Sequence, residues 1–229
     1  EITRRNEELI QFNYRVSHDL VGPIKTIEGL ADCATADLED GNTADLSEAL
    51  TRISRMARQQ SRVVGGIFDL CQADLLPQAE EQIELRPLVL QMFERACAAH
   101  PTRHVRLEID VADGLTVQAP TNRLSQILLN VIGNSIKFSR SDDPDAVVTV
   151  RAWIDDGCAH MEVRDNGVGI PASARDRIFE LFFRGQSTET GGAGLGLYIV
   201  HRNIEQMNGK VAPVSYTHIR AHETSLHLV

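Results

Sequence analysis

The sequence lacks the features that would link it to structural metals, disulfides or a lipid bilayer. Its four cysteines are far apart and form no C-x-x-C pair, so neither a zinc site nor a disulfide framework is indicated. Scattered thiols are typical of small buried residues in a reducing compartment. No signal peptide and no apolar run of membrane-spanning length is recognisable. We therefore expect a cytoplasmic portion of a protein.

Positive charge is also scarce. The 229 residues contain 23 Lys and Arg against 32 Asp and Glu, which gives a net charge of −9. This balance argues against a nucleic-acid partner, so any bound polyanion must be held by local groups. Because Glu1 is not an initiator methionine, we expect a piece of a longer protein, with any membrane anchor outside these residues.

Residues 1–75 are expected to form a helical hairpin. Apolar residues recur every three or four positions over residues 1–40 and again over 45–73, and the turn cluster Asp40-Gly41-Asn42-Thr43 lies between them. Such a hairpin has one apolar face and little else to cover it, which predicts a homodimer through a four-helix bundle. Pro23 is expected to kink the first helix.

The periodicity changes after a predicted linker at residues 76–82. Short alternating runs predict strands and longer amphipathic runs predict helices, in a mixture that indicates an α+β sandwich with one sheet covered by helices. The expected strands are 83–85, 105–109, 115–118, 147–154 and 158–163, and the expected helices are 86–99, 121–138 and one that ends near Met207.

The first candidate site residue is His18, which Asp19 follows directly. Phe12, Val16 and Leu20 place it in an amphipathic helix, where a histidine is more often a core residue than a nucleophile. Taken alone, the pattern favours the structural role. Segments further along the chain change this balance.

A second candidate is the polar face of the helix predicted at 121–138. Asn130 and Asn134 lie one turn apart on an otherwise apolar helix, and Lys137 extends the same face. Amide oxygens suit Mg²⁺, and a lysine ammonium suits phosphate. Asparagines that hydrogen-bond their own helix are an equally good explanation of this segment by itself.

Two glycine-bearing segments could approach a nucleotide closely. Asp165-Asn166-Gly167-Val168-Gly169 follows a predicted strand, and its carboxylate could accept from an exocyclic amine. Gly191-Gly192-Ala193-Gly194-Leu195-Gly196-Leu197 enters a helix, whose N-terminal amides favour phosphate. A plain turn and a flexible loop are the simpler explanations. Between them, Ile178-Phe179-Glu180-Leu181-Phe182-Phe183-Arg184 suits a lid or a small core.

The order of these five segments resembles that of the sensor histidine kinases of two-component signal transduction. Ser17-His18-Asp19-Leu20 is similar to their phospho-acceptor box, the Asn130-to-Ser139 segment to the N box, and the other three to the G1, F and G2 boxes. The resemblance implies a dimerisation and phospho-acceptor hairpin at 1–75 and a catalytic domain at 83–211, with the ATP-binding fold shared by histidine kinases, gyrases and chaperones.

The resemblance also implies a nucleotide site with ATP and Mg²⁺ as cofactors. Asn130 and Asn134 would hold the Mg²⁺, Lys137 and Arg184 would contact phosphates, and Asp165 would bind the adenine amino group. The residues implied to bind the nucleotide are Asn130, Asn134, Lys137, Phe138, Asp165, Gly167, Gly169, Arg184, Gly192, Gly194, Gly196 and Leu197.

At the phospho-acceptor box, the resemblance implies that His18 attacks the γ-phosphate with help from Asp19, and that the phosphoryl group then passes to an aspartate of a response regulator. Gly22 departs from the family pattern, because many members have Thr or Asn four residues after the histidine to orient the water that dephosphorylates the regulator. Glycine has no side chain for this task, so we expect a competent kinase with weak phosphatase activity.

The last residues depart further. Residues 212–229 show no sustained apolar alternation, and the closing strand pair of the family is expected to be missing. We interpret this tail as non-native read-through at a truncated end. The loss of a core strand would expose a sheet edge and lower the free energy of unfolding.

Two alternatives remain at this stage. An ATPase of the chaperone, gyrase or mismatch-repair type would have a glutamate in place of Asn130 to activate water, and would lack the histidine-bearing hairpin. A dimeric ATP-binding scaffold, or a truncated kinase without transfer activity, would retain the fold alone. Labelling of the protein by ATP distinguishes these possibilities.

Overall fold

The computed structural model describes residues 2–40, 45–75, 79–140, 143–183, 194–214 and 224–228. It describes the backbone alone for residues 2–19, 62, 68–75, 214 and 224–228. The chain forms two compact units, the first from residues 1–69 and the second from most of the chain after Leu70. Within the described part, no helix combines the length and the apolar character that a membrane span needs.

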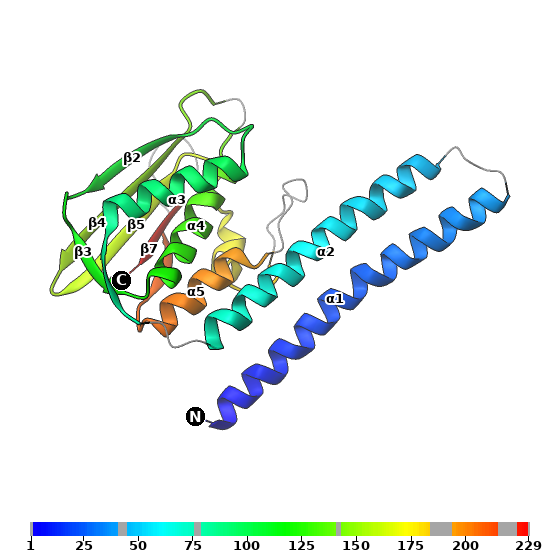
Figure 1. Ribbon diagram of the computed structural model, residues 1–229, viewed down its shortest axis with the longest axis horizontal. Coiled ribbons are helices and arrows are strands. Elements are labelled where there is room, and N and C mark those ends of the chain that lie inside the picture. Colours follow the sequence, from blue (N-terminus) through cyan, green and yellow to red (C-terminus); the bar gives the residue numbers. More distant parts are fainter. Residues whose placement is uncertain are drawn as a thin grey trace. The chain divides into compact units, whose positions relative to one another are not determined.

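The first unit is a hairpin of two long helices, as the periodicity predicted (Figure 1). Helix α1 spans Ile2–Glu39, and helix α2 begins at Leu46 and ends at Leu75, a few residues past the first unit. α1 continues through Pro23 without interruption, so the proline does not end the helix. Close to this proline, the Gln60 side chain of α2 donates from Nε2 to the carbonyl oxygen of Leu20, at 3.1 Å.

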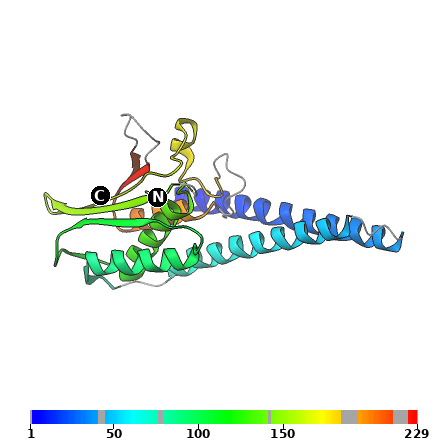
Figure 2. The ribbon, with the colours of Figure 1, turned by 90° about the horizontal axis from the view of Figure 1, so that it is seen from above.

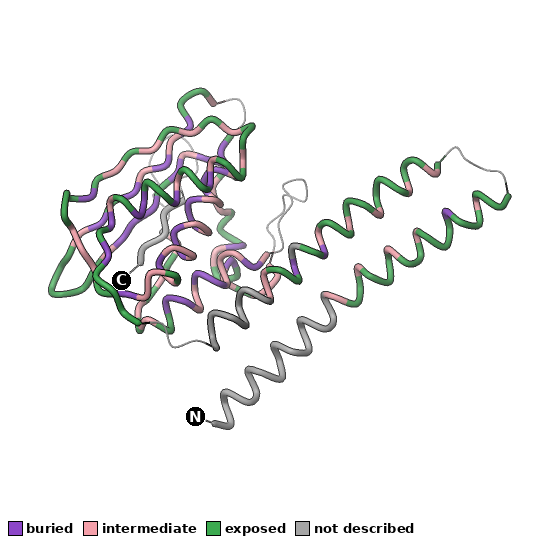
Figure 3. The backbone as a smooth tube through the Cα atoms, in the orientation of Figure 1, coloured by how far each residue is buried: buried purple, intermediate pink, exposed green. Residues whose placement is uncertain are grey.

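Few apolar side chains of the described part of the hairpin are buried. Among its described residues, Ala34 and Val63 are the buried apolar ones, and Gln60 is the buried polar one. Large apolar side chains that are 43–55% exposed lie along both helices, namely Val21, Ile24, Leu38, Leu50 and Val64. Figure 3 shows the same pattern, since the described part of the hairpin is mostly exposed or intermediate.

The second unit contains two sheets in place of the single one expected. In the smaller sheet, β1 (Glu81–Glu84) pairs antiparallel with β3 (Thr116–Ala119). The larger sheet has the strand order β2-β4-β5-β7-β6, with β2 and β4 parallel and all other neighbours antiparallel. Its strands are β2 (Arg106–Val111), β4 (Val147–Asp155), β5 (Cys158–Asp165), β6 (Val211–Val214) and β7 (Thr224–Leu228).

Three helices lie on one face of the larger sheet, as Figure 2 shows from above. They are α3 (Leu85–Ala99), α4 (Thr121–Lys137) and α5 (Gly196–Gln206), and a short 3₁₀ segment, η1 (Ala172–Arg177), follows β5. Successive side chains of a strand point to opposite faces, so Val148 and Val150 of β4 are fully buried under the helices while Thr149 and Arg151 face away. The α+β class is therefore confirmed.

The C-terminal strands correct an expectation from the sequence. We expected no closing strand pair, yet β6 and β7 pair with each other, and β7 also pairs with β5. β7 has five residues, which is too short a run for sustained alternation to reveal it in the sequence. The interpretation of residues 212–229 as non-native stays a prediction.

Candidate nucleotide site

Helix α4 brings the two asparagines together as predicted. Its apolar stripe packs against the sheet and α5, with Ile127, Leu128, Val131 and Ile132 at most 2% exposed, and this fixes the rotation of the helix. Asn130 and Asn134 are half-buried on another face. The Asn130 side chain donates from Nδ2 to the carbonyl oxygen of Gln126 at 2.9 Å, so its amide nitrogen is bound within the helix and its Oδ1 points the other way.

The start of helix α5 lies against this amide oxygen. A Cβ atom added to Gly196 would lie 2.9 Å from Asn130 Oδ1 and 3.7 Å from Asn134 Nδ2. A real Cβ is essentially never that close to an oxygen, so the absence of a side chain at Gly196 is what allows the close packing. The N-terminus of α5 therefore contacts the polar face of α4. The spacing of residues along the sequence did not by itself indicate this contact.

The segment after β5 lies against the other end of α4. Asp165, the last residue of β5, is 8% exposed, and its Oδ1 accepts a hydrogen bond from the amide of Gly167 at 3.0 Å. The amide of Val168 donates to the carbonyl oxygen of Phe138 at 3.1 Å. A Cβ at Gly167 would lie 2.5 Å from that same oxygen, so this glycine is required by backbone packing. Gly169, with φ of +72°, adopts the left-handed conformation that glycine favours.

A third contact joins the phenylalanine-rich segment to the glycine segment. Gly194 has φ of +70°, and a Cβ there would lie 2.7 Å from the carbonyl carbon of Phe182. Phe182 itself has φ of +61°, which is uncommon for a residue with a side chain. The backbones of Phe182 and Gly194 thus pack closely just before α5, and both residues have a positive φ.

Several predicted site residues cannot be placed by their side chains. His18 and Asp19 lie within α1, where the structure describes the backbone alone. Arg184 and Gly192 lie outside the described residues.

The remaining predicted residues lie at the ends of two helices. Lys137 and Phe138, at the end of α4, are half-buried, and the Lys137 ammonium lies 4.8 Å from the centre of the Phe138 ring. Leu197 follows Gly196 in the first turn of α5.

Positive charge gathers where α4 ends. Arg103 donates from Nη1 to the carbonyl oxygen of Ser139 at 2.9 Å, which holds the turn that follows the helix. Burial lowers the pKa of His100 below its ordinary value of 6.5, and the charges of Lys137 and Arg103 lower it further. The imidazole is therefore held neutral beside two permanent cations.

This lowered pKa predicts a loss of stability in mild acid. As the pH falls, the unfolded chain protonates its histidine first, at about pH 6.5, while the folded chain resists. The contribution of His100 is therefore present above about pH 6.5 and is lost as the pH falls through its lower folded pKa. We expect His100→Gln to flatten the fall in Tm between about pH 7 and pH 5, measured by circular dichroism. The exposed His104→Gln is the control, and an unchanged pH profile in His100→Gln would contradict the expectation.

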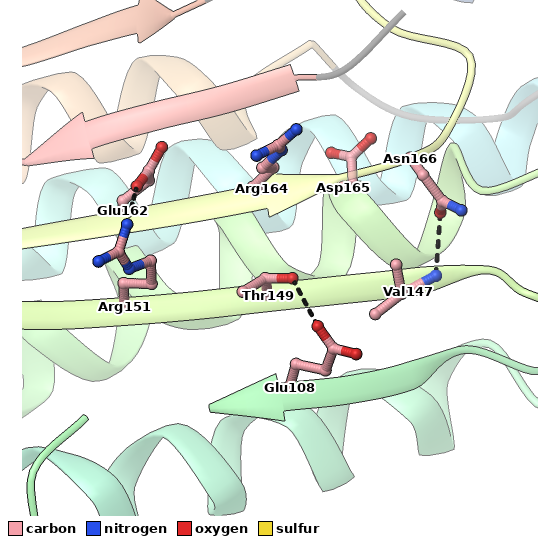
Figure 4. Close-up of a pocket in the computed structure, with 8 residues that line it drawn as sticks. All are labelled: Glu108, Val147, Thr149, Arg151, Glu162, Arg164, Asp165 and Asn166. Carbon is pink, nitrogen blue, oxygen red and sulfur yellow. Dashed lines mark hydrogen bonds and ion pairs between the residues drawn. The ribbon is translucent and has the colours of Figure 1, made fainter. Parts of the chain in front are cut away.

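A separate cavity of about 380 Å³ opens on the face of the sheet that the helices do not cover (Figure 4). Charged side chains dominate its lining, which consists of Glu108, Val147, Thr149, Arg151, Glu162, Arg164, Asp165 and Asn166. Ion pairs such as Arg151 Nε to Asp110 Oδ2, at 2.8 Å, lie along this face. Asp165 also lines this cavity, whereas the glycine contacts described above belong to the helix-covered side.

Sequence reasoning missed the polar residues that support the site. Asn166 accepts from the amide of Val147 at 2.9 Å and donates to the carbonyl of Asp145 at 3.0 Å, and so ties the segment after β5 to the start of β4. Asn203 of α5 is 2% exposed. The signal for Asn203 was present in the sequence, because it occupies the apolar stripe that Ile199, Val200 and Ile204 define.

The helix-covered mixed sheet and the glycine contacts at the end of α4 and the start of α5 fit a nucleotide-binding domain. Residues 119–225 match the family described as histidine kinase-, DNA gyrase B- and HSP90-like ATPases. The match spans α4, β4, β5, α5 and β6.

Curated relatives and solved structures match almost the whole chain and indicate which kind of ATP-binding protein it is most similar to. The sensor histidine kinase ZraS of Escherichia coli is 28% identical over 93% of this chain and 44% of its own length. Full-length ShkA, solved in complex with AMPPNP, is 25% identical with a TM-score of 0.61, over 94% of this chain and 45% of its own. The histidine kinase ThkA, solved with the response regulator TrrA, has a TM-score of 0.71 over 99% of this chain and 63% of its own. At 18% identity, ThkA supports the fold alone.

These findings confirm the resemblance to sensor histidine kinases that the five segments indicated. The chain spans only part of the length of its curated relatives. In four of them this share runs from 24% to 44%.

Proposed function

We propose that this chain phosphorylates itself on His18 with ATP and passes the phosphoryl group to an aspartate of a response regulator. The observation that carries the proposal is the convergence of two separate segments on α4 and the residue that follows it. Gly196 packs on Asn130 Oδ1, and Gly167 packs on the Phe138 carbonyl. Segments that approach so closely can bind a flat, charged ligand through backbone and amide groups.

Each described site residue has a chemical role in this proposal. Asp165 accepts from the adenine amino group, while Gly167 and Gly169 let the backbone approach the ring. Lys137 contacts phosphate, and Gly194, Gly196 and Leu197 line the phosphate side at the N-terminus of α5. Arg184 and Gly192 are proposed to contact the same phosphates.

Magnesium is the metal that this donor set fits. The Asn130 amide nitrogen is bound to the Gln126 carbonyl, which leaves Oδ1 directed at the Gly196 side, and Asn134 lies one turn further on. A carboxamide oxygen of the kind that Asn130 presents suits Mg²⁺, which keeps several waters and is shared with phosphates. When bound, the metal would neutralise charge on the β- and γ-phosphates.

The transfer itself requires mainly positioning. A ring nitrogen of His18 attacks the γ-phosphorus, the new P–N bond forms as the bond to the β,γ-bridging oxygen breaks, and ADP leaves. Asp19 accepts or polarises the second ring N–H. The phosphoryl group then moves from the histidine nitrogen to a carboxylate oxygen of the regulator.

We also propose that the hairpin dimerises. The exposed apolar residues Val21, Ile24, Leu38, Leu50 and Val64 are spread over both helices, and a second copy would cover them in a four-helix bundle. Burial of such side chains contributes about 25 cal/mol per Å² of apolar surface. Light scattering on the whole chain gives the oligomeric state directly.

The alternatives predict different chemistry. An ATPase needs a general base, whereas residue 130 is an asparagine whose amide is already bound to its own helix. An ATP-binding scaffold would bind nucleotide without transfer. The test is incubation of the whole chain with γ-labelled ATP and Mg²⁺. We expect label on the protein that is labile in acid and stable in alkali, and release of free phosphate without labelled protein would refute the proposal.

The departure at Gly22 gives a specific prediction about the reverse reaction. A Cβ at Gly22 would have nothing within 4 Å, so a larger side chain fits there. We expect Gly22→Asn to raise dephosphorylation of the phosphorylated regulator several-fold while it leaves self-labelling unchanged, because the amide can orient a water beside the phosphoaspartate. The measurement is loss of label from the regulator with ADP present.

The matched control for this variant is Gly29→Asn, seven residues further along the same helix and equally open. It carries the same helix-propensity change without approaching the phospho-acceptor box. A fast rate for the unmodified chain, or an equal gain in Gly29→Asn, would contradict the prediction.

A further inference from the structure

A buried polar link crosses the otherwise apolar contact between α4 and α5. Asn203, on the buried side of α5, is 2% exposed, and both ends of its carboxamide have partners on α4. Its Nδ2 donates to Gln126 Oε1 at 2.9 Å, and its Oδ1 accepts from Arg123 Nη1 at 3.4 Å. The surrounding side chains of α5 that are buried with it, Ile199, Val200 and Ile204, are all apolar.

This link is continuous with the candidate metal ligand. Gln126 binds Asn203 through its side chain and binds the Nδ2 of Asn130 through its backbone carbonyl. Asn130 in turn lies against Gly196, seven residues before Asn203 on α5. The two helices are therefore joined at two levels, which lie one turn apart on α4 and two turns apart on α5. Gln126 provides the α4 side of one level and Asn130 that of the other.

We propose that Asn203 is a positioning residue for the Mg²⁺–nucleotide site. Apolar contacts alone allow a helix to slide or rotate by small amounts, whereas a directional hydrogen bond specifies one register. The bond from Asn203 to Gln126 sets the register of α5 on α4, and this register places the N-terminus of α5 against Asn130 and directs Asn130 Oδ1 toward the metal. The inference rests on the proposed function, since it assigns the metal to Asn130.

Asn203→Leu and Gln126→Leu remove the link from its two ends without touching the proposed metal ligands. Leucine keeps the branching at Cγ that asparagine has, and its apolar character suits the neighbours of residue 203. The backbone carbonyl of Gln126 survives in both variants and still accepts from Asn130. The double variant removes both partners and leaves neither of the two carboxamides buried and unpaired.

The experiment measures binding of AMPPNP to the whole chain by calorimetry, over a series of Mg²⁺ concentrations and in EDTA. We expect each single variant and the double variant to need three- to tenfold more Mg²⁺ for half of the maximal affinity, with less than a twofold change in EDTA. The double variant should shift no further than Asn203→Leu alone, because that single variant already lacks the bond to Gln126. Self-labelling by ATP should show the same displaced Mg²⁺ dependence.

Ser135→Ala is the control. It removes a buried hydrogen bond within α4, from Ser135 Oγ to the Val131 carbonyl at 3.2 Å, without touching α5. Unchanged Mg²⁺ dependence in Asn203→Leu, or an equal shift in Ser135→Ala, would overturn the positioning role. Failure of the unmodified chain to bind AMPPNP at any Mg²⁺ concentration would instead overturn the proposed function, and with it this inference.

Discussion

Replacement of His18 by glutamine is expected to abolish labelling of the protein by γ-labelled ATP, with a loss of at least about a hundredfold, because no other group then forms the P–N bond. Glutamine keeps a similar size and polarity but has no nucleophilic ring nitrogen. His18 lies in α1, in the unit that does not contain α4, β5 or α5. Affinity for AMPPNP should therefore stay within twofold of the original value.

His160→Gln is the matched control for this variant. His160 lies in β5 of the second unit and stacks on Trp153, with ring centres 5.3 Å apart, so it is a histidine outside the unit that holds the phospho-acceptor box. Its loss should leave the label in place. Persistent acid-labile label in His18→Gln would show that another histidine is the acceptor, and would remove the central element of the proposal.

The second large effect is expected from Gly167→Ala. The new Cβ would lie 2.5 Å from the Phe138 carbonyl oxygen, and that oxygen belongs to backbone fixed by the end of α4 and by the Val168 amide. Overpacking of this kind costs about 1–3 kcal/mol of stability. The segment after β5 must move away from α4, so we expect a lower Tm and at least a tenfold loss of AMPPNP affinity.

Gly133→Ala, in helix α4, provides the comparison. A Cβ at Gly133 would have nothing within 4 Å, and a helical Gly-to-Ala change stabilises by about 0.5–1 kcal/mol. This variant should raise the Tm and leave nucleotide affinity unchanged. If Gly167→Ala behaved like Gly133→Ala, the close approach between the two segments would not be what forms the site.

The helices were predictable because their apolar spacing is a local property of the chain. The stripe through Leu124, Ile127, Leu128 and Val131 predicted a helix over 121–138, and α4 spans Thr121–Lys137. The same spacing placed Asn130 and Asn134 on one face. Local sequence determines such features because a helix satisfies its own backbone hydrogen bonds.

The contacts between segments were not predictable in the same way. The glycine-rich run marked Gly196 as a candidate, but nothing local shows that it packs on Asn130. Likewise, Asn203 interrupts an apolar stripe, but only the packing of α5 on α4 reveals Gln126 as its partner. The second sheet and the β7 pairing were missed because pairing partners depend on tertiary context, to which short strands with weak alternation give little clue.

The position of β7 has a consequence for how the ATP-binding unit forms during synthesis. The ribosome delivers β5 and β6 well before residues 224–228, yet β7 lies between them in the finished sheet. Until those residues emerge, β5 has an open edge, and the helices cover a sheet that is not yet complete. Such an edge pairs readily with other chains, so a nascent protein at this stage is the form most exposed to aggregation and most dependent on chaperones.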